Sequence, residues 1–322
     1  MVEGSYKVKP LVVHSDLPLI MAKLAFSQIG QSVGLERRNY DLNGMKTKDE
    51  VHLVWGMKYR PKIYKELAKQ KNLWFMENGW FSQSTGFTID PMGANGLSSL
   101  LHSQLPRDPT VSDEMIDSYT KDLHKRMKTH KDITNERDYI FIPLQVERDT
   151  QLLYWSECPA RHPNRLQWFV EQVCRAFPNE RLIFRPHPRD KDTGERISQS
   201  CGAFRGHKSS TLESGGNTYQ WIKHARAVIS INSTVLLEAL TFLTVPILAF
   251  GTGLFTGNGI FLEAKGDTGR LKEIFSYSIP VERRRWFLSI LMQRHIPYKM
   301  DFNGDTSFYP ELNALIKMTK EI

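Results

Sequence analysis

Short apolar runs alternate with segments of helical spacing along most of this chain, and this alternation constrains its fold more than any other feature. The apolar run 139–144 is followed by a helical pattern at 165–176 and then by the run 182–185. The series continues with a helix at 218–225, a strand at 227–231, a helix at 233–242 and a strand at 245–250. Strands and helices in this order predict parallel sheets covered by helices.

The first part of the chain repeats the pattern. Strands are predicted at 9–14, 51–55 and 72–76, with helices at 17–29 and 61–70. A chain of 322 residues is long enough for two domains. We therefore expect an α/β protein with two Rossmann-like domains facing a cleft. The first would comprise residues 1–133, with 278–322 packing back on it, and the second residues 134–277.

The chain is basic, with 43 Lys and Arg residues against 35 Asp and Glu residues and a net charge of +8 at pH 7. A positive charge of this kind suits nucleic acid, an anionic membrane surface, or acidic small molecules and glycans. The basic residues are scattered, and no recognition motif for nucleic acid is present. We therefore expect no nucleic-acid partner.

The sequence carries no clear signal for a membrane, for secretion or for a structural metal. No apolar run is long enough to cross a membrane, and the first residues lack a signal-peptide core, which favours a cytoplasmic protein. The cysteines are Cys158, Cys174 and Cys201, and they show no CxxC spacing. Neither a disulfide framework nor a zinc site is therefore expected.

Two segments of the second domain carry groups that favour anions. The cationic segment Arg185–Arg189 follows an apolar run, so it should lie at the carboxyl end of a strand. The segment Ser230–Thr234 ends another strand and opens a helix, with Ser233 or Thr234 at the N-cap. In an open α/β sheet both segments lie on the edge where ligands bind. A ligand that carries a phosphate or a carboxylate is therefore predicted.

Three further segments should reach the same cleft, because each leaves the end of a predicted strand. They are Glu77–Phe81, Asp90–Gly96 and Gln145–Asp149. No G-x-G-x-x-G follows the first strand, and no G-x-x-x-x-G-K-[ST] occurs. Dinucleotide oxidoreductases and P-loop nucleoside triphosphatases are therefore not indicated.

Taken in order, these segments resemble the capsule polysaccharide synthesis and export family, whose characterised members include β-Kdo glycosyltransferases. The family pattern comprises E-x-G-W/F-x, D-x-x-G-x-N, a strand ending in Q-x-x-x-D, R-x-H-P, and a Ser/Thr-rich turn before a helix. The matching residues here are Glu77–Phe81, Asp90–Asn95, Gln145–Asp149, Arg185–Pro188 and Ser230–Thr234. The resemblance agrees with a GT-B-like architecture, which consists of two Rossmann-like domains with a cleft between them.

The resemblance implies a retaining transferase that moves Kdo from CMP-β-Kdo to a glycan or glycolipid acceptor. Asp149 would be the nucleophile, and Glu77 the general acid/base or an acceptor-site carboxylate. His187, Ser233 and Thr234 would contact the CMP phosphate. The other candidate binding residues are Arg185, Pro188, Asn232, Gln145, Glu238, Asp90 and Asn95.

The residue types agree with this chemistry. A carboxylate nucleophile gives retention through two displacements, as in glycosidases that use a pair of carboxylates. CMP-Kdo carries one phosphodiester and one sugar carboxylate, so no diphosphate–magnesium clamp is required. No cofactor is therefore expected, and a metal is optional.

Simpler interpretations remain for several residues. Asp149 could only cap a helix, and Glu147 on the same loop is the rival nucleophile. Asp90 could only hold its glycine-rich turn together. Glu238 could reach a ribose hydroxyl or could be solvated. The competing functions are a transferase that uses another nucleotide sugar, such as a UDP or GDP sugar, and a non-catalytic protein of polysaccharide binding or export assembly.

The segment 281–291 is basic and amphipathic. Lying on an anionic membrane would suit a glycolipid acceptor, and the protein would then be peripheral at the inner membrane. The alternative is a helix whose apolar side packs on the first domain.

Overall fold

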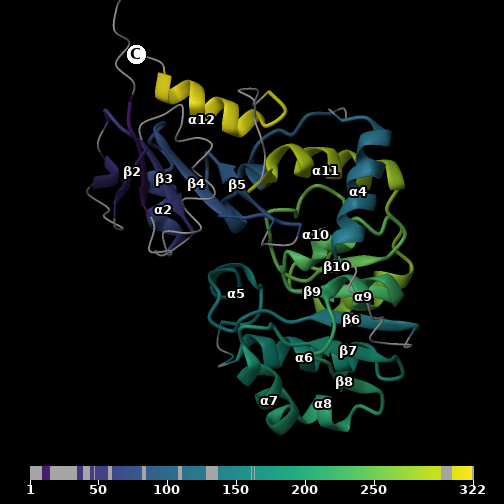
Figure 1. The fold of residues 1–322 in the computed structure, drawn as a ribbon. Coiled ribbons are helices and arrows are strands. Elements are labelled where there is room, and N and C mark those ends of the chain that lie inside the picture. Colours follow the sequence, from purple (N-terminus) through teal and green to yellow (C-terminus); the bar gives the residue numbers. More distant parts are fainter. Residues whose placement is uncertain are drawn as a thin grey trace, which may run out of the picture. The chain divides into compact units, whose positions relative to one another are not determined.

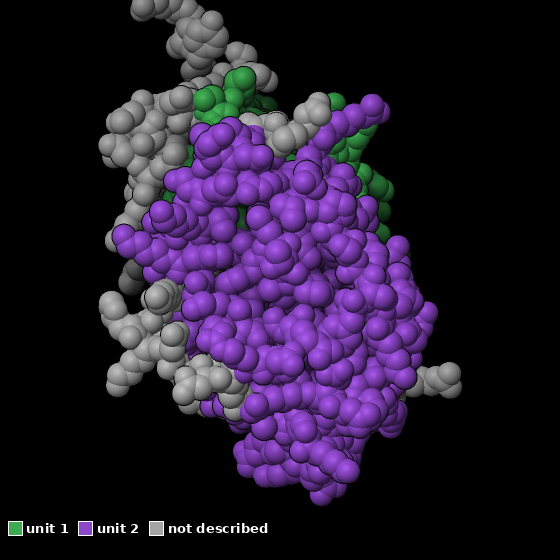
Figure 2. All heavy atoms as spheres, turned by 90° about the vertical axis from the view of Figure 1, so that its right-hand side faces the viewer, with its two compact units in different colours: residues 1–105, 290–322 green, residues 106–289 purple. Residues whose placement is uncertain are grey.

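The computed structural model describes residues 9–14, 35–38, 44–46, 48–56, 60–81, 85–107, 111–127, 137–160, 162, 164–298 and 307–320. The chain forms two compact units, shown as ribbons in Figure 1 and in separate colours in Figure 2. Unit 1 comprises residues 1–105 and 290–322, and unit 2 comprises residues 106–289. The helix expected at 17–29 lies outside the described residues.

Unit 2 contains a parallel sheet in the order β11-β10-β9-β6-β7-β8 within the described part of the chain. Its strands are β6 (Tyr139–Pro143), β7 (Leu182–Arg185), β8 (Ser210–Leu212), β9 (Ala225–Ser230), β10 (Ile247–Ala249) and β11 (Leu262–Glu263). When these strands are numbered 1 to 6 along the chain, their order across the sheet is 3-2-1-4-5-6. This is the order of a Rossmann sheet. The α/β class and the Rossmann-like topology predicted for this part of the chain are confirmed.

Helices precede, connect and follow these strands. They are α4 (Asp113–Met127), α5 (Thr150–Trp155), α6 (Arg165–Ala176), α7 (Lys191–Ser200), α8 (Gly202–Gly206), α9 (Thr218–His224), α10 (Val235–Leu240), α11 (Val281–Arg294) and the 3-10 helix η3 (Thr268–Phe275). Polar residues start several of them, as expected from N-cap preferences. Asn164 accepts from Gln167 N–H at the start of α6, and Asn217 does the same for Gln220 N–H at the start of α9.

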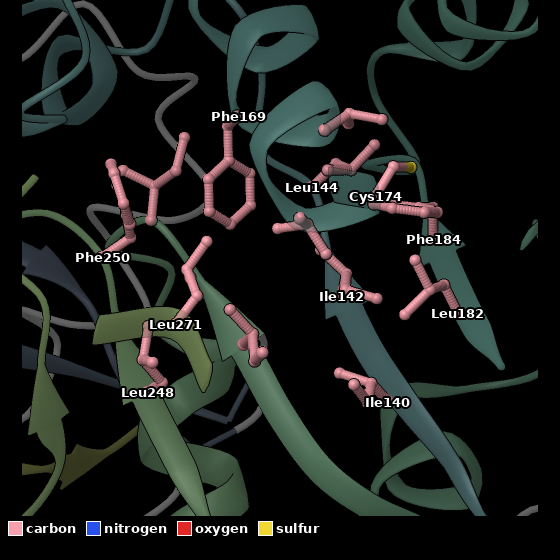
Figure 3. Packing of buried hydrophobic residues seen from close by; sticks show 14 of the residues in the cluster. Ile140, Ile142, Leu144, Phe169, Cys174, Leu182, Phe184, Leu248, Phe250 and Leu271 are labelled. Carbon is pink, nitrogen blue, oxygen red and sulfur yellow. The ribbon is translucent and has the colours of Figure 1, made fainter. Parts of the chain in front are cut away.

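The core of unit 2 follows from the alternation of side chains along its strands. Ile140 and Ile142 of β6 point toward α6, where Phe169 and Cys174 join the same buried cluster (Figure 3). Phe141, between them, points to the other face and stacks on Trp221 of α9. Both faces of the sheet are therefore buried, which explains why its strands read as continuous apolar runs.

Unit 1 contains a sheet in the order β12-β5-β4-β3-β1-β2, again within the described residues. Its strands are β1 (Leu11–His14), β2 (Leu35–Arg38), β3 (Val51–Trp55), β4 (Leu73–Asn78), β5 (Gly86–Asp90) and β12 (Ile296–Pro297). Strands β2, β1, β3 and β4 are parallel, but β5 runs antiparallel to β4. A short hairpin joins β4 to β5, whereas a parallel crossover needs about a dozen residues or more. The strands predicted at 9–14, 51–55 and 72–76 are parallel, as expected, and the antiparallel β5 adds to them.

Helices cover both faces of the unit 1 sheet. The other elements of this unit are α2 (Pro61–Leu67), α3 (Ser99–His102), α12 (Pro310–Lys320), and the 3-10 helices η1 (Gly44–Lys46) and η2 (Asn95–Leu97). Leu312 and Leu315 of α12 enter the core cluster on one face. On the other face Tyr64 of α2 meets Phe75 of β4 edge to face.

The unit boundaries lie at 105/106 and 289/290, whereas the expected ones were 133/134 and 277/278. Helix α4 and the first part of α11 belong to unit 2 because they contact each other. Arg285 of α11 pairs with Asp117 of α4 at 2.6 Å, and His124 of α4 stacks on Phe242 just after α10. These contacts are long-range, so the sequence pattern alone did not indicate them.

The apolar side of α11 is buried. Phe287, Leu288 and Leu291 are at most 1% exposed. These three side chains are therefore not available to contact a membrane, and they favour the alternative that α11 packs its apolar side against the protein. Among the described residues, no helix combines the length and the hydropathy that a membrane span requires.

Candidate functional site

The carboxyl edge of the unit 2 sheet is the natural place for a ligand. From β6 the chain proceeds outward through β7 to β8, and from β9 it proceeds the other way through β10 to β11. The strand order therefore reverses between β6 and β9. In open α/β sheets the ligand crevice lies outside the carboxyl ends of the strands at such a switch point. The loops after β6, β7 and β9 are thus the candidate site.

The floor of this site is a closed pair of amides. The Gln145 side chain donates through Nε2 to Asn232 Oδ1 at 2.9 Å and accepts from Asn232 N–H at 3.2 Å. Asn232 Nδ2 also faces the carbonyls of Gln151, Trp155 and Thr252. Both side chains are buried. They join the loops at the switch point to each other, and their predicted role in binding substrate stays a prediction.

The two carboxylates of the β6–α5 loop differ in their surroundings. Glu147 accepts hydrogen bonds from the backbone N–H groups of Arg165, at 2.9 Å, and Leu166, at 3.3 Å. It therefore caps the start of α6. Burial raises the pKa of Glu147, and these two N–H donors oppose the rise. Its carboxylate anchors the loop to α6 through both oxygens.

Asp149 caps α5, because its Oδ1 accepts from Gln151 N–H at 2.7 Å. No described residue donates a hydrogen bond to its second oxygen, Oδ2. The side chain is half-buried. Capping and chemistry are therefore compatible in Asp149, since each function can use a different oxygen.

His187 lies on the neighbouring loop, after β7. Its Nδ1 accepts from Arg189 N–H at 3.1 Å, so the proton of the neutral imidazole is assigned to Nε2. Burial lowers the pKa of His187, and Arg189 lowers it further, whereas the negative charges of Asp149 and Asp190 oppose this. The lowered pKa favours the neutral imidazole, which carries a donor at Nε2.

Arg185 is held by a different loop. Its guanidinium donates to the carbonyls of Gly215, at 2.7 Å, and Gly216, at 2.6 Å. Burial lowers its pKa, and the charge of Glu238 opposes this. Arg185 thus fixes the β8–α9 loop beside the carboxyl edge. Pro188 is exposed on the His187 loop.

The β9–α10 turn carries the remaining candidates of unit 2. Thr234 is the N-cap residue of α10 but makes no capping bond with its side chain. Ser233 instead accepts from Val235 N–H at 3.2 Å through its hydroxyl. Glu238, in the first turn of α10, is 9% exposed and influences Arg185. Glu238 is therefore buried, and the alternative of a solvated side chain was wrong.

In unit 1, Glu77 lies near the carboxyl end of β4. Its Oε1 would be 3.5 Å from a Cβ atom placed on Gly56, which directly follows β3. Glu77 is half-buried. It therefore lies at the carboxyl edge of the parallel part of this sheet, as expected from the sequence.

Asp90 has a structural environment. Its carboxylate accepts from the backbone N–H of Met92, Gly93 and Ser99 and from the hydroxyls of Ser98 and Ser99. Arg294 lies 3.7 Å away. Because β5 is antiparallel, Asp90 pairs with Phe75, in the first half of β4, rather than ending at the edge that carries Glu77. These contacts favour the interpretation that Asp90 holds its turn.

Asn95 begins the short helix η2 and has a positive φ of 55°. Asparagine tolerates this left-handed conformation better than most residues do. Its place in the D-x-x-G-x-N pattern therefore has a backbone explanation, and its predicted role in binding substrate stays a prediction.

One residue that shapes the carboxyl edge of the unit 2 sheet, Asp190, was not singled out from the sequence. Asp190 accepts from Glu147 N–H at 3.1 Å and caps α7, so it joins the β6 and β7 loops. An aspartate directly before a helical segment is a recognisable N-cap signal. The hydrogen bond between Asp190 and Glu147 N–H, in contrast, leaves no recognisable pattern in the sequence. Within the described ranges, no cluster of three or more His, Cys, Asp or Glu side chains could hold a metal ion.

Comparisons with known proteins place this geometry in context. The chain is 27% identical over 252 residues to Protein FixF of Sinorhizobium fredii (strain NBRC 101917 / NGR234). The matched region covers 75% of this chain and 58% of FixF. The chain therefore spans less than two thirds of the length of this curated relative.

Two solved structures share the fold. Thermosulfurimonas dismutans KpsC, beta Kdo 2,7 transferase, matches with a TM-score of 0.57 and 14% identity, over 97% of this chain and 100% of that chain. Thermosulfurimonas dismutans KpsC, beta Kdo 2,4 transferase, matches with a TM-score of 0.55 and 13% identity, over 96% and 98%. At these identities the likeness concerns the fold. A family model described as capsule polysaccharide biosynthesis protein matches residues 105–273, more than half of the chain. The chain therefore belongs to the capsule polysaccharide biosynthesis protein family.

Proposed function

We propose that this protein is a retaining glycosyltransferase that moves Kdo from CMP-β-Kdo to a glycan or glycolipid acceptor. In the first step the Asp149 carboxylate bonds to the anomeric carbon while the bond from that carbon to the phosphate oxygen of CMP breaks. In the second step the acceptor hydroxyl oxygen bonds to the same carbon and the bond to Asp149 breaks. The hydroxyl proton passes to a general base, for which Glu77 is the candidate.

One observation carries the choice of nucleophile. Of the two carboxylates on the β6–α5 loop, only Asp149 keeps an oxygen that receives no hydrogen bond from the described residues, whereas both oxygens of Glu147 accept backbone N–H groups. Asp149 also lies beside the switch point of the sheet and acts electrostatically on His187. This favours Asp149 over Glu147.

We propose that His187 binds the phosphate of CMP, which is the leaving group of the first step. Negative charge builds on the CMP phosphate as the bond to Kdo breaks, and a donor fixed in advance stabilises that charge. The Nε2–H of His187 is such a donor, since its ring is oriented by the bond from Arg189 N–H to Nδ1. Ser233 and Thr234 are proposed on the same phosphate. Glu238 is proposed at the ribose.

The fold supports this proposal at a coarser level. The chain shares it with two structures that are described as β-Kdo transferases, and its family is one of capsule polysaccharide biosynthesis. The donor, the retention of configuration and the acceptor are the parts that the proposal adds. A membrane-peripheral location would follow if the acceptor is a glycolipid.

The nucleophile is tested with Asp149→Asn. Asparagine caps a helix about as well as aspartate, so the start of α5 is retained while the nucleophilic oxygen is lost. We expect transfer from CMP-Kdo to fall by about 1,000-fold or more, with CMP binding unchanged. Mass spectrometry of the wild-type protein with donor alone should show a Kdo adduct on the peptide that contains Asp149.

Glu147→Gln is the matched control on the same loop. Its amide oxygen can still accept from Arg165 N–H, so we expect turnover within about threefold of wild type. Loss of turnover in Glu147→Gln, with turnover retained in Asp149→Asn, would reassign the nucleophile to Glu147.

The nucleotide is tested by thermal unfolding. A ligand that binds only the folded state stabilises it by about 2.7 kcal/mol at 100 times its Kd. CMP should therefore raise the Tm, whereas UDP and GDP at equal concentration should not. Stabilisation by UDP or GDP alone would point to another nucleotide sugar, and the absence of stabilisation by all three would favour a non-catalytic polysaccharide-binding protein.

A further inference from the structure

A buried histidine fills the hairpin that follows the Glu77 strand in unit 1. His295 is the residue between α11 and β12, and it is 4% exposed. The hairpin joins β4 to β5, and its first residues are Gly79, Trp80 and Phe81. Since β12 pairs with β5, with Pro297 opposite Gly86, the backbone brings His295 to the base of this hairpin.

The two ring nitrogens of His295 hold both arms of the hairpin. Nδ1 accepts from Trp80 N–H at 3.2 Å on the outgoing arm, and Nε2 lies 3.3 Å from Thr85 Oγ1 on the returning arm. Thr85 donates its own hydroxyl proton to Phe81 O at 2.6 Å. These bonds are all satisfied when the imidazole is neutral with its proton on Nε2.

Two glycines leave the space that the imidazole occupies. A Cβ atom at Gly79 would lie 2.2 Å from Cε1 of His295, and one at Gly86 would lie 2.7 Å from Nε2. Gly79 N–H also donates to Gly86 O at 2.8 Å and closes the hairpin. The glycine of the Glu77–Trp80 segment is therefore required by the contact with His295, more than two hundred residues later in the chain.

The hairpin determines where the end of β4 lies. Glu77 pairs with Thr88, and Asn78 pairs with Phe87, immediately before the residues that His295 holds. The carboxylate of Glu77 lies beside Gly56, so a shift of the strand end would move it along the sheet edge. Displacement of a reacting group by about 1 Å can lower a rate about 100-fold.

From this geometry we infer that His295 is a positioning residue for Glu77. It fixes the hairpin through Trp80 N–H and so sets the place of the Glu77 carboxylate, without contacting substrate itself. This inference rests on the proposed function of Glu77 as a general base. It differs from a purely structural role because it ties the orientation of one backbone N–H to turnover.

Two polar variants separate the bonds of His295. The amide oxygen of His295→Asn can take the place of Nδ1 and keep the acceptor for Trp80 N–H. The amide of His295→Gln reaches toward the Nε2 position and keeps the donor to Thr85 instead. We expect kcat within about threefold of wild type for His295→Asn and at least about 10-fold lower for His295→Gln, with the KM for CMP-Kdo unchanged in both.

Hydrogen exchange of the peptide that contains Trp80 provides a readout independent of activity. Exchange should be faster in His295→Gln than in wild type, and close to wild type in His295→Asn. Thermal unfolding of both variants gives the temperature at which each is folded during the assay. A merely structural histidine would lower the Tm in both variants but leave kcat per folded molecule unchanged.

Glu77→Gln in the same assay separates failure of this inference from failure of the proposed function. If Glu77→Gln loses turnover while His295→Gln keeps it, the positioning role is wrong and the base assignment stands. If Glu77→Gln keeps turnover, the base assignment fails, and with it the positioning role. Equal turnover of His295→Asn and His295→Gln would also overturn the inference, because the bond to Trp80 would then not matter.

Discussion

At the scale of single residues, the polar side chains of the unit 2 edge divide into two groups. Gln145, Asn232 and Glu147 direct their polar atoms to other parts of the protein, and they hold the loops in place. Asp149 and His187 each use one atom for local structure and keep a second atom that no described residue binds. Substrate chemistry needs atoms of the second kind, so the site is expected to act through Asp149 and His187.

His187 should bind the CMP phosphate as a neutral donor. Because burial and Arg189 lower its pKa from 6.5, the ring is uncharged at neutral pH and above and offers Nε2–H. His187→Ala should weaken CMP binding about 10-fold, which corresponds to one hydrogen bond to a charged group. His187→Gln, with an amide N–H near the Nε2 position, should stay within about threefold of wild type.

Calorimetry across pH checks this prediction for His187. The ratio of CMP affinities between wild type and His187→Gln should be constant at and above the ordinary histidine pKa of 6.5, since neither side chain changes charge there. A ratio that grows steadily as the pH falls through that range would show that the imidazolium, and not the neutral ring, binds the phosphate.

At the scale of elements, an ion cluster ties three parts of unit 1 together. Arg294, at the end of α11, lies 2.8 Å from Glu311 of α12 and 3.7 Å from Asp90 of β5. Burial raises the pKa of Glu311, and Arg294 opposes the rise. One guanidinium therefore offsets two largely buried carboxylates. Its role is to hold these elements in place, which agrees with the interpretation that Asp90 holds its turn.

Removal of Arg294 should destabilise the protein strongly. Arg294→Met leaves two carboxylates without their shared cation, and breaking a buried ion pair in this way costs about 2 kcal/mol or more. Urea unfolding measures the loss. The double variant Arg294→Met with Glu311→Gln should regain part of it, since one of the two orphaned charges is then absent. A double variant no more stable than Arg294→Met alone would contradict the shared role.

The loop anchor Glu147 gives a second prediction at this scale. Burial raises its pKa above the ordinary value of 4.5, so the folded protein holds this proton to higher pH than the unfolded chain does. The contribution of Glu147 to stability is therefore full below the ordinary pKa and declines as the pH rises through the raised pKa.

Glu147→Gln does not titrate and serves as the reference for this effect. The difference in unfolding free energy between wild type and Glu147→Gln should favour wild type most at about pH 4 and least at about pH 7. Urea unfolding of both proteins across that range measures it. A difference that grows with pH would mean that the N–H groups of Arg165 and Leu166 outweigh burial.

Elements with strong local signals could be predicted, and elements set by partners could not. The strands of unit 2 were visible as apolar runs because both sheet faces are buried, and the helix starts were visible through Asn164 and similar caps. The reversal at β5 depends on a hairpin that His295 fills from far along the chain. The pairing of Gln145 with Asn232 likewise joins residues that are distant in the sequence, so the sequence pattern did not indicate it.

At the scale of the whole molecule, the family match and the switch point coincide. The matched residues 105–273 cover nearly all of unit 2, where the loops after β6, β7 and β9 meet at one sheet edge. Glu77 lies in unit 1, outside that match. The nucleotide-binding part of the proposal therefore rests on family, fold and geometry together, whereas the role of Glu77 rests on its motif and its place at the edge of its sheet.

If CMP-Kdo is the donor, removal of metal ions from the protein should have little effect on turnover. When a nucleoside diphosphate sugar reacts, the nucleoside diphosphate leaves, and its charge is commonly balanced by a divalent cation, whereas CMP leaves with a single phosphate. In the proposed site that phosphate meets the Nε2–H of His187 in a chain with a net charge of +8. Turnover with CMP-Kdo should therefore stay within about twofold of the untreated rate after treatment with EDTA.

The decisive comparison is re-addition of metal to the EDTA-treated protein. If turnover is lost with EDTA and returns with Mg²⁺ or Mn²⁺, a cation shares the leaving-group charge, and His187 is then not sufficient for the phosphate. If turnover is unchanged in wild type but becomes metal-dependent in His187→Ala, the cation replaces the lost donor. That second result would locate the charge of the departing phosphate at His187, because only a group at that position would be exchanged for a metal ion.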